Sequence, residues 1–214
     1  AVGKEAVKGG LLATIEGGST IKAMTAGDGC IYYITDEGYA YFLYRFDLTT
    51  QQSVPMGQLE LFSVPSGLAY DPANNMIYAT AGFYVFQFQV DKLNANDFNR
   101  YTNQVMDSDY CTLTGITCVD GALYTVGNDY YTSAPKMMKY PDKYLDNRQV
   151  ILEGFEVSLV DGATDFSYDA SSDLFYLTDA GHNIYTMDLA GNVESVDLLG
   201  SGLDINGLAI FPAE

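Results

Sequence analysis

One short phrase recurs four times in this chain, and its spacing constrains the fold more than any other feature. In each copy an apolar residue precedes a tyrosine and opens a short apolar run. The copies are Ile31-Tyr32, Ile77-Tyr78, Leu123-Tyr124 and Phe175-Tyr176, so the tyrosines lie 46, 46 and 52 residues apart. A period of about 40 to 50 residues made of strands and turns is typical of a β-propeller or a similar array.

The second copy shows the expected layout of one blade most clearly. Residues 67–70 are predicted to form an inner strand. Residues 71–75 form a turn, because Asp and Asn bond their own backbone and Pro fixes φ. The runs 76–81 and 83–90 are the next two strands. The fourth copy follows the same order almost as clearly, and the first and third copies follow it with different loop lengths.

The composition agrees with an all-β chain. It contains 18 tyrosines, 11 phenylalanines and 21 glycines, and aromatic runs alternate with turns rich in Gly, Asn and Asp. No long segment shows a helical period. Glycines recur near the start of the inner strands, where a close backbone approach favours a residue without Cβ; they are Gly67, Gly115 and Gly207.

Both ends of the chain repeat parts of a blade. Residues 207–212 repeat the inner-strand phrase, and residues 11–15 resemble a last strand. We therefore predict one domain, a small all-β propeller with four full blades and a reduced fifth blade, closed by strands from residues 1–18 and 203–214. The four full blades are expected at about 21–62, 63–108, 109–157 and 158–202. An open fragment of a larger propeller is the alternative.

The excess of acidic residues limits the kinds of partner that the protein is expected to bind. The 214 residues include 28 acidic and 10 basic ones, giving a formal net charge of −18. Such a field repels phosphate groups, so we expect no nucleic acid and no anionic lipid as partner. Apolar runs stay well below the about 18 residues of a membrane helix, so we expect no membrane insertion. The first ten residues hold no apolar block like that of a signal peptide, so we expect a mature chain or a piece of a longer one.

The cysteines and the clustered basic residues are expected to serve structure rather than chemistry. Cys111 and Cys118 are too far apart along an extended strand to form a disulfide, and no CxxC occurs, so we expect buried free thiols. The cysteine count leaves the compartment open. Four basic residues gather in one blade, and we expect them to form a solvated edge with local charge balance: Lys136, Lys139, Lys143 and Arg148.

The sequence contains no recognisable catalytic constellation. His182 is the only histidine, which excludes a histidine-based metal cluster or a two-histidine acid–base pair within the chain. No GxSxG elbow, phosphate loop or GxGxxG occurs. Carboxylates are plentiful, so a glycosidase-like pair stays an alternative. We predict that the protein is not an enzyme.

A propeller brings two sets of connections to one end of its ring: those that leave each second strand and those that enter each inner strand. Here these connections are rich in carboxylates and aromatic rings, which suit sugar rings, peptides or a calcium-bridged ligand. The candidate ligand-binding residues are Asp36, Tyr39, Tyr84, Asp129, Tyr130, Asp165, Asp179 and His182. Phe83 and Tyr131 are expected at the same end. No EF-hand series is complete, so we expect no cofactor, although the carboxylates leave calcium open.

Three segments resemble known propeller repeats. Gly-Leu-Ala-Tyr-Asp-Pro-Ala-Asn-Asn-Met-Ile-Tyr at 67–78 and Tyr-Thr-Met-Asp-Leu-Ala-Gly-Asn-Val at 185–193 resemble the repeats of bacterial surface β-propellers of the YVTN and NHL kind. The ending Gly-Leu-Ala-Ile-Phe-Pro-Ala-Glu at 207–214 is similar to the close of propeller modules in large secreted bacterial proteins, where bacterial immunoglobulin-like domains commonly follow. The resemblance implies an extracellular or cell-surface bacterial module with neighbouring domains and without catalytic residues.

These observations predict a recognition module that binds a glycan or another protein at the acidic, tyrosine-lined end of the ring. One alternative is a carbohydrate-active enzyme that uses loop carboxylates such as Asp165 and Asp179. The other is a purely structural spacer domain, for which that end of the ring would have no ligand.

Overall fold

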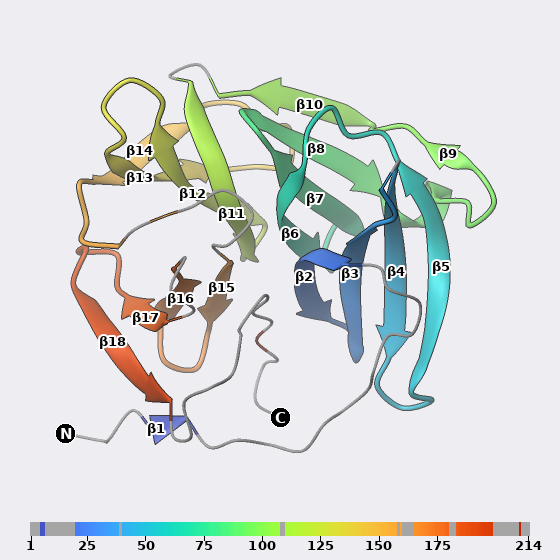
Figure 1. Cartoon of the computed structure of the whole chain (residues 1–214), viewed down its shortest axis with the longest axis horizontal. Coiled ribbons are helices and arrows are strands. Elements are labelled where there is room, and N and C mark those ends of the chain that lie inside the picture. The colour runs from blue at the N-terminus through green and yellow to red at the C-terminus, as the bar shows by residue number, and fades with distance from the viewer. Residues whose placement is uncertain are drawn as a thin grey trace.

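In the computed structural model, four sheets surround a common centre (Figure 1). Each sheet contains a run of four antiparallel strands, which is one blade, and the inner strands of the blades lie nearest the centre. The residues that the structure describes are 5–6, 20–38, 40–107, 110–157, 159, 165–179, 183–198 and 210.

The strands of each blade follow one another along the chain. Blade 1 contains β2 (Thr20–Gly27), β3 (Cys30–Asp36), β4 (Tyr41–Asp47) and β5 (Gln52–Leu59). Blade 2 contains β6 (Pro65–Asp71), β7 (Met76–Ala81), β8 (Tyr84–Gln89) and β10 (Asn103–Met106). Blade 3 contains β11 (Cys111–Val119), β12 (Ala122–Asp129), β13 (Pro135–Tyr140) and β14 (Gln149–Glu153). Blade 4 contains β15 (Phe166–Asp169), β16 (Leu174–Thr178), β17 (Ile184–Met187) and β18 (Val193–Leu198).

The recurring tyrosine phrase marks the second strand of every blade, and the four predicted blades are confirmed. Tyr32, Tyr78 and Tyr124 lie in β3, β7 and β12 and are buried, whereas Tyr176 in β16 is partly exposed. A strand in the middle of a blade packs against neighbouring blades on both faces, so it carries apolar residues on both faces instead of alternating. β7 illustrates this, because five of its six residues are buried.

The inner-strand glycines let neighbouring blades approach closely. A Cβ on Gly67 would meet the backbone of Gly115 and Ile116, and a Cβ on Gly115 would meet the Cβ of Phe166. The close approach predicted from the sequence is therefore confirmed at these two glycines, while Gly207 lies outside the described residues.

Three apolar clusters fill the interfaces between consecutive blades, which we call seams. The cluster between blades 1 and 2 includes Ile34 and Phe86. The cluster between blades 2 and 3 includes Tyr78 and Ile116. The cluster between blades 3 and 4 includes Phe166. The core of the protein is thus divided among its seams, as expected for a ring of stacked sheets.

A connection from blade 2 reaches across to blade 1. It contains the 3-10 turn η1 (Val90–Lys92) and the two-residue strand β9 (Phe98–Asn99), which pairs in parallel with β5. Asn99 Nδ2 donates to the carbonyl oxygens of Met56 and Gln58, each at 3.2 Å. Gly57 has a φ of +106°, and a Cβ there would collide with this amide. We call this contact of Asn99 with the backbone of β5 the clamp; the sequence did not predict it.

The predicted fifth blade is only partly within the described residues. The two-residue strand β1 (Glu5–Ala6) pairs in parallel with β18 and extends the sheet of blade 4. The remaining residues of the predicted closing strands, apart from Ile210, lie outside the described part of the chain. The reduced fifth blade therefore stays a prediction.

Candidate functional site

The ring has two ends that present different residues. The entry end carries the connections between second and third strands and those that enter the inner strands. The hairpin end carries the turns between inner and second strands. Every predicted ligand-binding residue that the structure describes belongs to the entry end by its position in its blade. Tyr39 and His182 lie outside the described residues.

Three of the predicted carboxylates fold their own loops. Asp36 accepts a hydrogen bond from the N–H of Gly38 at 2.8 Å. Asp165 is buried and accepts one from the N–H of the next residue at 2.8 Å. Asp179 is buried and accepts one from the hydroxyl of Tyr185 at 2.9 Å, which raises the pKa of that tyrosine. These contacts tie each carboxylate to its own blade, and a shared ligand-binding role stays a prediction.

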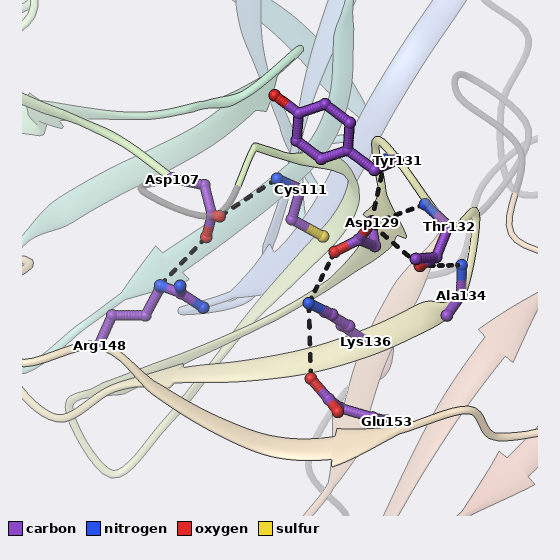
Figure 2. Close-up of polar contacts among 9 residues, drawn as sticks. All are labelled: Asp107, Cys111, Asp129, Tyr131, Thr132, Ala134, Lys136, Arg148 and Glu153. Atoms are coloured by element: carbon purple, nitrogen blue, oxygen red, sulfur yellow. Dashed lines mark hydrogen bonds and ion pairs between the residues drawn. The ribbon is translucent and has the colours of Figure 1, made fainter.

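Asp129 is held most firmly, and Figure 2 shows its contacts. Its Oδ1 accepts hydrogen bonds from the N–H groups of Tyr131 at 3.0 Å and Thr132 at 2.8 Å. Its Oδ2 lies 2.8 Å from Lys136 Nζ, which also lies 3.5 Å from Glu153 Oε1. The bond from Lys136, followed by those from Thr132, holds the pKa of Asp129 well below its usual range. Asp129 therefore fixes the loop that carries the two neighbouring tyrosines.

A second ion pair lies in the seam between blades 2 and 3 (Figure 2). Arg148 Nε lies 3.2 Å from Asp107 Oδ2, and Asp107 Oδ1 accepts a hydrogen bond from the N–H of Cys111 at 3.2 Å. The side chains of Arg148 and Lys136 are each only 13% exposed. The expected solvation is therefore wrong for these two residues, whereas the expected local charge balance is present, because each long side chain reaches a carboxylate.

Four aromatic side chains form an exposed group at the entry end, which we call the ring cluster: Phe83, Tyr110, Tyr130 and Tyr131. The ring centroids of neighbouring members lie 5.4 to 6.3 Å apart, in edge-to-face geometry. The three tyrosines are 44%, 63% and 76% exposed in chain order. Edge-to-face contacts stabilise aromatic groups beyond simple burial. The cluster joins blade 2 to blade 3.

The backbone around the ring cluster is fixed by the two ion-paired loops. The N–H of Tyr110 donates to the carbonyl of Asp107 at 3.2 Å, and the N–H of Tyr130 donates to the carbonyl of Tyr110 at 3.1 Å. The Asp107 and Asp129 carboxylates therefore bond the segments that carry the rings.

Two aromatic residues of this end were absent from the predicted set. Phe62 is exposed, and its ring packs edge-on against the predicted residue Tyr84 with centroids 6.1 Å apart. Tyr110 belongs to the ring cluster. Both lie in connections that enter an inner strand, and this shared position is the sequence signal that could have identified them.

The hairpin end holds a pocket of about 590 Å³ at the centre of the ring. Turns from all four blades line it together with Ile210. Its acidic residues are Asp28, Asp71, Asp120 and Asp169, and its aromatic residues are Tyr70 and Tyr168. From the sequence these turns are expected only to connect strands, and no ligand is predicted at this end.

The described residues give no sign of a metal centre or a disulfide. Within them, no group of three or more His, Cys, Asp or Glu side chains is placed to hold a metal ion. Calcium binding stays a prediction. The three cysteines are free thiols; Cys30 and Cys111 are buried, as predicted, whereas Cys118 is only partly buried, and burial raises the pKa of Cys111 to about 12. No helix in this part of the chain is long and apolar enough to cross a membrane.

No protein-family model and no curated protein matches this sequence. Solved structures do match, among them one titled "Crystal structure of Nidogen/Laminin Complex". It aligns with a TM-score of 0.63 and 17% identity, over 90% of this chain and 69% of that chain. At this identity the likeness concerns the fold alone, and the YVTN or NHL type and a bacterial source stay predictions. Together with the four blade sheets, it identifies the chain as an all-β protein of the β-propeller fold.

Proposed function

We propose that this propeller is a non-catalytic module that recognises another protein through the ring cluster at its entry end. The cluster is the observation that carries the proposal, because it exposes three adjacent tyrosines on a braced base. Tyrosine is enriched among the residues that dominate protein interfaces, since its ring is large, rigid and amphipathic.

The charge of the chain selects the kind of partner. A net charge of −18 repels an acidic surface and attracts a basic one over distances of about 8 to 10 Å at physiological salt. The two basic side chains near the ring cluster, Lys136 and Arg148, are already paired with carboxylates. The partner is therefore expected to contact the rings with an apolar patch bordered by lysine or arginine.

The similarity to a solved complex supports a protein partner. The matched structure is titled a complex of nidogen and laminin, so that chain was solved together with another protein. We also propose that the protein is extracellular or lies on the cell surface, and that it has neighbouring domains in a larger polypeptide. These extensions rest on the sequence resemblance to bacterial surface propellers.

A glycan is the second candidate ligand for the same surface. Tyr130 and Tyr131 are the members of the ring cluster with the largest exposed fractions. Exposed tyrosine rings can pack against the apolar faces of sugars while their hydroxyls bond sugar oxygens.

The carbohydrate-active enzyme considered from the sequence is not proposed. The two loop carboxylates that test it, Asp165 and Asp179, are both buried. Both also accept hydrogen bonds from strands of their own blade. A general acid and its partner carboxylate need access to the substrate. Turnover of an oligosaccharide set by the wild-type chain, lost in Asp165→Asn and Asp179→Asn variants, would reverse this judgement.

The test compares two sets of exposed tyrosines. The double variant Tyr130→Ser/Tyr131→Ser removes the two most exposed rings of the cluster, and Tyr144→Ser is the matched control because Tyr144 is 64% exposed and outside the cluster. Each immobilised protein is presented with an extracellular protein fraction and with a glycan array. Every retained protein is then purified, and its dissociation constant is measured in solution.

We expect the double variant to weaken binding of the purified partner by about 30-fold or more, equivalent to about 2 kcal/mol, with no change for Tyr144→Ser. Retention of glycans alone, lost in the same variant, would favour the second candidate. Equal retention by all three proteins would contradict both and favour the spacer.

A further inference from the structure

We propose that the pocket at the hairpin end binds an organic cation, that is, a ligand bearing an alkylammonium or guanidinium group. This inference is independent of the ring cluster, which lies at the other end of the ring. Its basis is the pocket itself, whose volume of about 590 Å³ falls in the range of about 300 to 1,000 Å³ typical of small-molecule sites.

The walls of the pocket suit a cation with an apolar stem. Tyr70 and Tyr168 line it together with the apolar residues Val119 and Ile210. A cation placed over a tyrosine face is attracted by the electrons of the ring. The hydroxyl of Tyr168 donates to Asp173 at 2.7 Å, which raises the pKa of this tyrosine to about 12.

Every blade contributes one aspartate to the pocket at the end of its inner strand: Asp71 and Asp169 are the last residues of β6 and β15, whereas Asp28 and Asp120 directly follow β2 and β11. Two of these carboxylates are committed to their turns. Asp71 accepts a bond from the N–H of Ala73 at 3.0 Å, and Asp169 accepts one from the N–H of Ser171 at 2.9 Å.

The other two aspartates are available to a ligand. Asp28 is exposed and accepts a bond from the hydroxyl of Tyr70 at 2.7 Å, which leaves its second oxygen for another donor. Asp120 is also exposed and has no hydrogen bond or ion pair among the described contacts. The two residues belong to blades 1 and 3, so their carboxylates approach the pocket from different sides of the ring.

No basic residue lines the pocket within the described part of the chain. Lys143 touches its rim by donating to the side-chain oxygen of Asn74 at 3.2 Å, but it is not a lining residue. Among the described residues, the negative charge of the lining therefore has no cation of its own inside the pocket. The described carboxylates also do not gather into a metal-binding group, so their spacing favours a larger organic cation.

The test measures binding of n-butylammonium by isothermal titration calorimetry, with neutral 1-butanol as the matched probe of the same shape. A second titration uses a tripeptide with a central lysine and blocked ends. It distinguishes binding of a free amine from binding of a lysine side chain of a protein. The site variant is Asp28→Asn/Asp120→Asn. Asparagine keeps an acceptor for Tyr70, so the turn is expected to fold, and the melting temperature checks this.

The charge-matched control is Asp91→Asn/Asp146→Asn, which removes two exposed carboxylates away from the pocket. We expect saturable binding of n-butylammonium, weakened about tenfold in the site variant and within about twofold of wild type in the control. Absence of saturable binding at millimolar concentrations would overturn the proposal. So would equal affinity for 1-butanol, or equal weakening in the control, which would indicate a general field effect.

Discussion

The seam between blades 1 and 2 is held by aromatic rings and a neutral amide, whereas the seam between blades 2 and 3 contains buried charges. In the first, the rings of Tyr32 and Tyr70 lie 4.8 Å apart, and Asn99 bonds the backbone of blade 1. In the second, Asp107 faces Arg148 at 3.2 Å. Both seams also contain an apolar cluster, so the difference lies in the polar contacts added to it.

This difference suggests different roles for the two kinds of contact: one stabilises the fold, and the other positions the segments that it joins. Rings and satisfied amides gain from burial, whereas two charges taken out of water first lose their hydration. A buried ion pair is therefore weak support for stability, but it fixes the geometry of the segments that carry it. The charged seam is also the one that the ring cluster bridges, so we infer that the charges position the ring cluster.

The largest expected effect tests the charged seam. Asp107→Ala leaves the nearly buried guanidinium of Arg148 without this carboxylate, so we expect a loss of about 3 to 5 kcal/mol of unfolding free energy. Urea denaturation followed by fluorescence measures it. The double variant Asp107→Asn/Arg148→Met should recover most of the loss, because it removes both charges and keeps an acceptor for the N–H of Cys111. If Asp107→Ala lowers the unfolding free energy by less than about 1 kcal/mol, the two seams do not differ in the way described.

A smaller loss is expected at the clamp between blades 1 and 2. Asn99→Ala removes the amide that bonds the carbonyls of Met56 and Gln58, and we expect a loss of about 2 to 3 kcal/mol in the same denaturation experiment. Asn96→Ala is the matched control, since Asn96 is exposed in the same connection and should cost less than about 0.5 kcal/mol. Equal effects of the two changes would mean that the clamp does not stabilise the seam.

A third variant tests how much the hydroxyl of Tyr70 contributes to the seam between blades 1 and 2. Tyr70→Phe keeps the ring contact with Tyr32 and removes the bond to Asp28, so we expect a loss of about 1 kcal/mol near pH 7. Burial, followed by this bond, raises the pKa of Tyr70 above its ordinary value of 10. The folded state therefore holds the proton more tightly than the unfolded state, and stability should fall as the pH rises above 10.

Denaturation between pH 8 and pH 11 measures that slope. Other buried tyrosines contribute to it, so the Phe variant is expected to show a shallower fall than wild type, not a flat line. Identical slopes for the two proteins would show that Tyr70 does not titrate differently in the folded state.

The smallest effect on stability is expected at Lys136. Lys136→Met removes the main cause of the low pKa of Asp129, so that pKa should rise toward its ordinary value of 3.8. A lowered folded pKa stabilises the protein above the unfolded value and loses this contribution as the pH falls. The variant should therefore lose less stability between pH 5 and pH 2 than wild type. Carboxyl NMR titration measures the pKa, and an unchanged value would contradict the assigned cause.

The four blades were predictable because their signals are local and repeated. The tyrosine phrase appears at a regular spacing, and Gly67 and Gly115 recur at one position of the inner strand. When a pattern is repeated within one chain, each copy supports the assignment of the others, since every copy must satisfy the same packing on both faces. The reduced fifth blade has only fragments of the phrase, and most of its residues lie outside the described part of the chain.

The site was harder to predict because its residues meet across segments. Lys136 and Arg148 looked solvated, as charged residues usually are, and their partners Glu153 and Asp107 lie on other segments. Asn99 occurs in a polar stretch that resembles an ordinary loop, so nothing local marks it as a clamp. The pocket depends on the curvature that brings four separate turns to one centre, and no single turn carries that information.

The two shortest strands affect how this protein meets copies of itself. β9 and β1 each lie in parallel along the outer strand of a blade, at β5 and β18. They cover part of backbone that would otherwise offer free hydrogen-bonding groups to another chain. β10 and β14, the outer strands of blades 2 and 3, have no such cover within the described residues, and they expose Met106 and Val150. Edge-to-edge association at high concentration is therefore expected to begin at these two blades.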